Sequence, residues 1–212
     1  METPFAVLRS FARPRANVER CEMCSLEVSA AHPHLVDPET RQIICACEAC
    51  AILFSGNAQT KYRRVPRRIR ALPDFKLSDA QWDSLLIPIQ LAFFFHSSPL
   101  GRVVALYPSP AGAMESLLSL DSWEEIVKEN PILGEVEADV EALLVNRVRN
   151  QRDYYLAPID ECYKLVGVIR GYWRGLSGGQ EVWQEIERFF TSLRKRSAVV
   201  GGTSGARTGF QG

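Results

Sequence analysis

"CEMC" at residues 21–24 and "CEAC" at residues 47–50 are the two stretches that decide how this chain begins to fold. Each is a C-x-x-C pair, and 22 residues separate one pair from the other. Two-residue spacing lets both sulfurs of a pair point at one ion from a single tight turn, and four thiolates complete the tetrahedral shell that zinc prefers in structural sites. The sequence therefore predicts a metal site formed by Cys21, Cys24, Cys47 and Cys50.

The residues between and after the two pairs predict a small zinc-binding fold. "HLVD" and "RQIIC" are strand-like, and "PET" between them offers Pro38 as a turn former. "EACAILF" suits a helix whose first turn carries Cys47 and Cys50 on one face, where the helix dipole favours thiolates. A knuckle, a hairpin and a helix in this order are typical of a treble clef, so we predict a treble-clef-like zinc module.

Three further residues in this segment leave the ligand set open. Cys45 is a fifth thiol, a candidate for a core residue, for a ligand in place of Cys47, or for a ligand of an iron–sulfur cluster. His32 and His34 are alternative ligands, although their place at the entry to a hairpin favours the surface or a position beside the ligands. Zinc is favoured over iron, because neither pair is followed by the glycine typical of rubredoxin-like knuckles.

The composition is that of a globular protein with a sizeable core. Of the 212 residues, 46% are hydrophobic and the formal net charge is zero, so the field of the whole protein favours neither nucleic acid nor membrane. Five of the six cysteines lie between residues 21 and 50, and such clustering favours metal over disulfides. The sequence shows no secretory signal and no apolar run of the ~20 residues that a membrane span needs, so we expect a cytoplasmic protein.

The later part of the chain predicts a larger α+β domain, with strands first and helices late. "LLIPIQLAFFF" and "RVVALYP" read as a hairpin turned at Gly101, and "VEALLVNRV" and "DYYLAPI" as a second strand pair, although "VEALLVNRV" also suits a helix. Helices are expected after a Ser122–Glu125 capping box, with a stop at Pro131, and after an Asp160 N-cap. A last helix would bury a stripe made of Val182, Trp183, Ile186, Phe189, Phe190 and Leu193.

These elements predict an order of segments along the chain. A flexible tail at residues 1–20 precedes a four-cysteine module at 21–56, a basic linker at 57–74, an α+β domain at 75–196 and a flexible tail at 197–212. The linker contains "KYRRVPRRIR", which carries six basic residues and no acidic one. Nucleic-acid binding through Arg63, Arg64, Arg67 and Arg68 is therefore an alternative function, although a single tyrosine in the strip offers little base stacking.

"LSGGQ", residues 176–180, copies the signature peptide of ABC-type ATPases. A nucleotide site of that class also needs a P-loop, whose Gly-Lys pair holds the phosphates, and this sequence contains no Gly-Lys pair. We therefore predict no ATP binding, and we interpret Gly178 and Gly179 as a tight turn ahead of an amphipathic helix.

The residue types of common catalytic sites are present, but their pattern does not predict an enzyme. Cys162 lies on an apolar helical stripe, and no histidine follows His96 to serve as its base. His96 beside two serines lacks the oriented base and oxyanion hole of a hydrolase triad. Three carboxylates could pair as catalytic acids, but they are better interpreted as solvated carboxylates at the start of a helix. They are Asp153, Asp160 and Glu161.

The chain resembles domain-of-unknown-function family 5947, a bacterial family. The resemblance rests on "CEMC", "HPHLVD", "ICACEACAILF", "YRRVPRR", "YPSPAGAMES", "DVEALLVNR", "PIDECYKLVGVIR" and "WRGLSGGQEVWQEIERFF", and covers about residues 20–195. Members of that family are often encoded beside [NiFe]-hydrogenase genes, so the resemblance implies a role near hydrogenase assembly or electron delivery.

Taken together, these patterns favour a non-enzymatic, zinc-binding accessory protein whose partner is another protein, such as a hydrogenase subunit or maturation factor. The first alternative is an electron-transfer protein that holds iron on the same cysteines, in a rubredoxin-like or iron–sulfur site. The second alternative is a nucleic-acid-binding zinc-finger protein that uses the basic strip.

Overall fold

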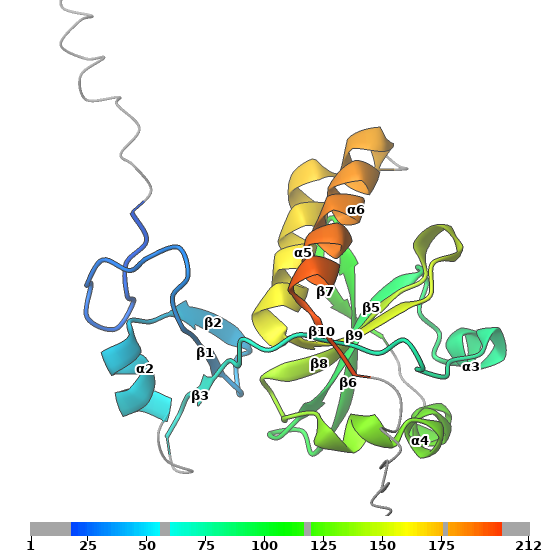
Figure 1. Cartoon of the computed structure of the whole chain (residues 1–212), viewed down its shortest axis with the longest axis horizontal. Coiled ribbons are helices and arrows are strands. Elements are labelled where there is room, and N and C mark those ends of the chain that lie inside the picture. The colour runs from blue at the N-terminus through cyan, green and yellow to red at the C-terminus, as the bar shows by residue number, and fades with distance from the viewer. Residues whose placement is uncertain (1–17, 56–59, 117–119, 176–177, 201–212) are drawn as a thin grey trace, which may run out of the picture. The chain divides into compact units, whose positions relative to one another are not determined.

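The computed structural model describes residues 18–55, 60–116, 120–175 and 178–200, and it combines helices with strands as the α+β class requires. The chain divides into two compact units. The first unit comprises Met1–Asp37 and Gln42–Arg64, and the second comprises Pro38–Arg41 and Val65–Gly212. The four cysteines of the predicted metal site all belong to the first unit, which is drawn mostly in blue and cyan in Figure 1.

The first unit is built on a small antiparallel sheet with the strand order β2-β1-β3. Its elements are β1 (His34–Asp37), β2 (Gln42–Cys45), β3 (Arg63–Arg64) and helix α2 (Glu48–Ser55). Strands β1 and β2 form the predicted hairpin, in which Leu35 pairs with Ile44. The buried core consists of Cys21, Leu35, Ile44, Ala46, Cys47, Cys50 and Ala51. A core this small, in which three members are thiols, supplies little of the stability that a domain needs by itself.

The second unit contains a seven-stranded sheet with the order β10-β4-β9-β8-β5-β6-β7. Its strands are β4 (Arg70–Ala71), β5 (Leu91–Ser97), β6 (Arg102–Ser109), β7 (Gly112–Glu115), β8 (Glu141–Asn146), β9 (Asp153–Pro158) and β10 (Ala198–Val199). Among the strands that the structure describes in this sheet, only the β10–β4 pair is parallel. Both predicted strand pairs, β5 with β6 and β8 with β9, are present, and Gly101 takes a positive φ of 61° in the first turn.

Helices cover both faces of this sheet (Figure 1). The helical elements are α3 (Asp79–Ser84), α4 (Leu120–Glu129), η1 (Pro131–Glu135), η2 (Val148–Asn150), α5 (Ile159–Tyr172) and α6 (Gly179–Arg196). Phe93 meets Tyr163 of α5, whereas the next residue, Phe94, meets Trp82 of α3 and Trp123 of α4. Successive side chains of β5 are therefore buried on opposite faces, which explains its continuous apolar sequence. Among the described residues, no helix is long and apolar enough to cross a membrane.

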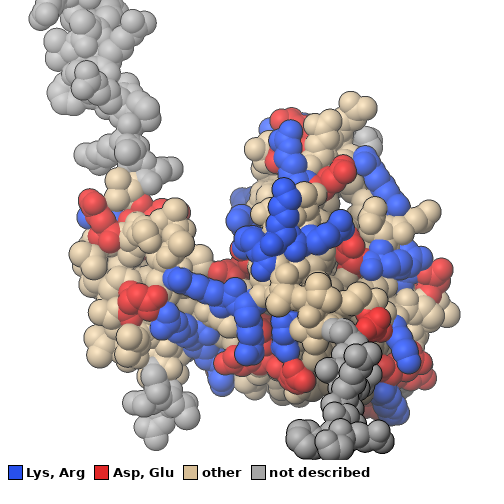
Figure 2. Space-filling view, viewed as in Figure 1, with Lys and Arg blue, Asp and Glu red and all other residues tan. Residues whose placement is uncertain are grey.

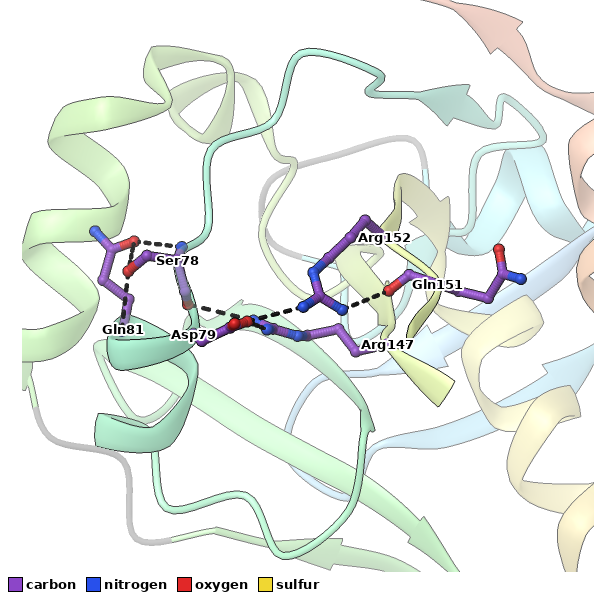
Figure 3. A network of polar contacts seen from close by, with 6 residues as sticks. All are labelled: Ser78, Asp79, Gln81, Arg147, Gln151 and Arg152. Atoms are coloured by element: carbon purple, nitrogen blue, oxygen red, sulfur yellow. Dashed lines mark hydrogen bonds and ion pairs between the residues drawn. The ribbon is translucent and has the colours of Figure 1, made fainter. Parts of the chain in front are cut away.

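A buried arginine ties α3 to the end of β8 (Figure 3). Ser78 and Gln81 form a capping box at the start of α3, with Gln81 N donating to Ser78 Oγ over 3.1 Å. Arg147, which directly follows β8, has a side chain only 3% exposed and forms an ion pair with Asp79. Arg152 reaches the same carboxylate at 2.9 Å. Asp79 thus balances the charge that Arg147 carries into the interior, and removing Asp79 would leave that buried charge uncompensated.

Three predictions about element ends are wrong. Helix α4 begins at Leu120, so Ser122 lies inside the helix and is not its N-cap. Helix α5 begins at Ile159 with Pro158 as N-cap, so Asp160 lies in the first turn, where an acidic residue still favours the dipole. Strand β5 begins only at Leu91, because the chain turns before it with Leu86 at φ +54°.

Short strands lie within the segments that were predicted to be a basic linker and a flexible C-terminal tail. Within residues 57–74, β3 pairs with β1 and β4 pairs with β9. Within residues 197–212, β10 pairs with β4. Residues 1–17 and 201–212, which make up most of the two predicted tails, lie outside the described residues.

Candidate metal centre

The four predicted ligands converge at one place in the first unit. The sulfurs of Cys21, Cys24, Cys47 and Cys50 lie within 4.8 Å of one another, and those of Cys24 and Cys47 are 3.8 Å apart. In a tetrahedral zinc site with Zn–S bonds of about 2.3 Å, the sulfurs are about 3.8 Å apart along each edge. The four side chains therefore fit a single tetrahedral ion with small adjustments, and such an ion would cross-link the knuckle to the helix.

Backbone hydrogen bonds explain why the first pair forms a knuckle. Cys21 N donates to Leu26 O over 2.8 Å, and Ser25 N donates to Cys21 O over 2.7 Å. Ser25 closes the turn with a positive φ of 64°. These contacts bring Cys24 back over Cys21, as two ligands of one ion require.

The second pair lies at the start of helix α2. Cys47 directly precedes the helix, one position earlier than the sequence predicted, and Cys50 lies in its first turn. Cys50 N donates to the Cys47 sulfur over 3.4 Å. The Cys47 sulfur therefore occupies the acceptor position of a helix cap, where the dipole favours negative charge.

The surroundings of the sulfurs make their acidities unequal. Burial raises the pKa of Cys21, but backbone N–H groups donate to its sulfur and lower the pKa to about 6. These donors belong to Cys47, Cys24 and Met23. Burial raises the pKa of Cys50 to about 12, and hydrogen bonding to the neighbouring sulfurs acts in the same direction. Cys21 thus forms a thiolate readily, whereas Cys50 needs a cation to compensate its charge, so metal binding must release protons.

The structure places the three alternative ligands in a group of their own. His32, His34 and Cys45 offer one ligand atom each within 4.8 Å of one another, separately from the four-cysteine group. Cys45 therefore does not replace Cys47 in that group. Burial raises the pKa of the Cys45 thiol, and the nearby carboxylates of Glu22 and Glu19 raise it further.

The basic strip is largely engaged with acidic partners inside each unit. In the first unit, Arg64 pairs with Glu48 at 2.6 Å. In the second unit, Arg68 Nε and Nη2 bind the Glu141 carboxylate at 2.7 and 3.0 Å, and Arg70 pairs with Glu135 at 2.7 Å. On the face shown in Figure 2, basic and acidic atoms of the second unit are interspersed. A strip whose charges are paired in this way attracts phosphates less strongly than its sequence suggests.

Glu141 is a buried carboxylate that sequence reasoning missed. It is 0% exposed in β8, accepts hydrogen bonds from Arg68 and from Glu137 N, and lies 3.7 Å from the Arg70 guanidinium. Burial raises the pKa of Glu141, but these donors outweigh burial and hold the pKa below its ordinary value. The only sequence signal for the contact between Glu141 and the two arginines is weak. It is the Arg-x-Arg spacing of Arg68 and Arg70 together with a single Glu in an apolar strand.

Replacing Glu141 with glutamine should lower the free energy of unfolding by about 2 kcal/mol at pH 7, because charge-assisted hydrogen bonds are lost. A carboxylate whose pKa is lowered by folding stabilises the protein above its unfolded pKa of about 4.3, and this contribution disappears as pH falls through the folded pKa. Urea unfolding of both proteins from pH 7 to pH 3 should therefore show the difference shrinking in acid. Glu187→Gln, at a side chain 74% exposed, is the control and should change little. A difference independent of pH would contradict the assignment.

The side chains of common catalytic types do not form a catalytic site among the described residues. Cys162 is fully buried in α5, and burial raises its pKa far above the ordinary value. Ser98 Oγ donates to the Asp139 carboxylate over 2.6 Å rather than to a histidine, while His96 is exposed. Asp153 and Glu161 bind Arg194 and Arg196 of α6, and Asp160 Oδ1 accepts from Glu161 N. The ion pairs with Arg194 and Arg196 therefore tie α6 to β9 and α5.

Packing and backbone conformation explain why residue 178 of the "LSGGQ" peptide is a glycine. Leu176 and Ser177 lie outside the described residues. Gly178 is the N-cap of α6 with a positive φ of 86°, and a Cβ at this position would lie 2.9 Å from Val182 and 3.1 Å from Trp173. A glycine is therefore required here by backbone conformation and by close contact, without any phosphate.

The second unit contains a cavity of about 620 Å³ beside this turn. Its volume lies within the range of small-molecule sites, and its walls are mostly apolar. Trp173 and Trp183 are only half-buried because they border the cavity, although sequence periodicity assigned Trp183 to the core. The lining residues are Ile89, Gln90, Leu91, Tyr107, Pro108, Ser109, Pro110, Val148, Arg149, Ile169, Trp173, Trp183 and Ile186.

Fold and site together define an α+β protein with a cysteine cluster near its N-terminus that can hold a metal ion. The chain matches DUF5947, a family of unknown function, over residues 20–197. It belongs to this family, as the resemblance of its motifs predicted. No curated protein and no solved structure matches the chain.

Proposed function

We propose that this protein is a non-enzymatic accessory factor in which one structural zinc ion supports a docking platform for a protein partner. The observation that carries the proposal is the convergence of four sulfurs within 4.8 Å at the junction of knuckle and helix. Zinc bound by Cys21, Cys24, Cys47 and Cys50 would cross-link a treble-clef-like module. The free energy of metal binding would then supply most of the module's folding free energy, and a closed four-thiolate shell would leave no position for substrate.

The outer face of helix α2 supports a protein partner. Ile52, Leu53 and Phe54 are 62%, 72% and 42% exposed, so three consecutive large apolar side chains of α2, beginning two residues after Cys50, meet solvent. Exposed apolar groups of this kind mark sites of interaction. A hydrogenase subunit or maturation factor is the partner that the family resemblance favours, and cytoplasmic location would follow from such a role.

Iron is the second candidate, because a four-sulfur site with one exposed ligand also suits a rubredoxin-like centre. The decisive measurement is elemental analysis, with an absorbance spectrum, of protein purified without oxygen. We expect tightly bound zinc and no visible band. Iron with sulfur-to-iron charge-transfer bands would replace the structural role with electron transfer.

The docking part of the proposal is tested on the same preparation. Leu53→Asp should abolish co-purification of a hydrogenase component with the full-length protein, while the zinc content stays unchanged. Nucleic-acid binding ranks lower because Arg64, Arg68 and Arg70 of the basic strip pair with glutamates. Steeply salt-dependent binding of DNA or RNA by the wild-type protein would reverse this ranking.

A further inference from the structure

A second group of metal-ligand side chains lies in the first unit, apart from the four cysteines. One ring nitrogen each from His32 and His34 and the sulfur of Cys45 lie within 4.8 Å of one another. His34 and Cys45 are directly paired across β1 and β2, and the rings of His32 and His34 meet edge to face with centroids 4.7 Å apart. The register of the hairpin and this ring contact bring all three side chains together.

The hydrogen bonding of His32 leaves one nitrogen lone pair free for a ligand. Its side chain is only 5% exposed, and Nδ1 lies 2.8 Å from the backbone oxygen of Ser29. Since a carbonyl oxygen only accepts, Nδ1 carries the proton and Nε2 carries the lone pair. Nε2 is buried and has no hydrogen-bond partner among the described residues.

This arrangement of His32 is the one that metal-binding histidines use. Such a histidine donates its other ring N–H to a backbone carbonyl or carboxylate, which fixes the tautomer and the ring orientation. Here Ser29 O is the acceptor, and the Glu19 carboxylate lies 3.5 Å from the same nitrogen. A buried lone pair without a donor costs free energy, and a cation on Nε2 would remove that cost.

The geometry points to a second transition-metal site, in which His32, His34 and Cys45 bind one divalent ion of borderline softness such as Zn²⁺. Two imidazoles and one thiolate suit this class of ion better than Mg²⁺ or Ca²⁺, which prefer oxygen. Bonds of about 2.0–2.1 Å to nitrogen and 2.3 Å to sulfur require the ligand atoms to approach by about 1 Å from their widest separation. Three protein ligands leave a fourth position for water or for a donor from outside the chain, unlike the closed four-cysteine shell.

The two sites are linked through the backbone of Cys45. Cys45 N donates to the Glu22 carboxylate over 2.8 Å, and Cys45 O accepts from Glu22 N over 2.8 Å. Glu22 belongs to the knuckle of the four-cysteine site. Filling the first site would therefore hold Cys45 in place for the second, and an ion in the second site would favour the first by the same coupling free energy, although the two sites share no ligand.

The test is to count bound ions on the full-length protein and to observe its histidine nitrogens. We expect the wild-type protein to bind two equivalents of Zn²⁺, with the ¹⁵N NMR signals of two imidazoles shifted by the second. Cys45→Ser and His34→Asn should each lower the affinity for the second Zn²⁺ ion at least ~100-fold. A loss of this size corresponds to about one ligand's share of the binding free energy of a structural site. His96→Asn is the matched control, because His96 is exposed in the second unit and should not change either equivalent.

Co²⁺ substitution separates this inference from the proposed function. In Cys45→Ser, the sulfur-to-cobalt band of the four-cysteine site should persist at full intensity while the histidine signals return to their metal-free positions. A wild-type protein that binds one equivalent without shifting a histidine signal would overturn the second site alone. One equivalent that shifts the histidines and survives Cys24→Ser would instead overturn the four-cysteine site.

Discussion

Replacing Cys50 with serine should release the structural metal and unfold residues 21–55, while α5 and α6 stay folded. Cys50 is a buried ligand in the first turn of α2, and its sulfur lies within 4.8 Å of the other three. Binding of a structural zinc ion contributes about 10–16 kcal/mol in small zinc modules, far more than a seven-residue core can replace. The hydroxyl of serine does not supply a thiolate, so most of this free energy is lost.

The effect should stay local because the chain divides into two compact units. Amide exchange measured by NMR should show loss of protection in β1, β2 and α2, with protection in β8 and α5 unchanged. Cys162→Ala is the control variant: it also removes a buried thiol, but one that lies in α5 of the second unit. It should keep the full metal content although it lowers the stability of that unit. Unchanged metal content in Cys50→Ser would contradict the ligand assignment.

Local patterns in the sequence were sufficient to predict the elements whose causes are local. The spacing of the cysteine pairs indicated which four sulfurs meet, since two-residue spacing has one simple geometric use. The hairpin β1–β2 and the helices α5 and α6 were predicted because alternation and helical periodicity appear within a few residues. The end of α4 before Pro131 follows from the missing N–H of proline.

Features that depend on distant residues were not predicted. Glu141 is buried because Arg68, 73 positions earlier, reaches it, and no pattern within β8 indicates that contact. Strands β4 and β10 have two residues each, too few for any periodicity, and form only because β4 pairs with β9 and β10 pairs with β4 at the edge of the sheet. Similarly, the sequence named His32, His34 and Cys45 as candidates, but only strand register shows that they form their own group.

Replacing Phe94 with alanine should have the opposite distribution of effects, destabilising the second unit and sparing the metal module. Phe94 lies on β5, between β8 and β6, and is 2% exposed. Its ring stacks on Trp123 of α4 with centroids 5.0 Å apart and meets the edge of Trp82 in α3 at 6.5 Å. Truncation leaves a cavity between the sheet and both helices, at a cost of about 3–5 kcal/mol. That cost is a large share of the ~5–15 kcal/mol that stabilises a typical domain.

Thermal or urea unfolding followed by tryptophan fluorescence will measure this loss, since Trp82 and Trp123 report directly on the contact. Leu100→Ala is the control, because Leu100 is 49% exposed between β5 and β6 and its removal should cost less than about 0.5 kcal/mol. Metal content and amide protection of β1, β2 and α2 should stay at wild-type values in both variants. If Phe94→Ala released the metal as readily as Cys50→Ser does, the two units would have to fold as one, and the module could not be the independent, metal-dependent platform that its four sulfurs imply.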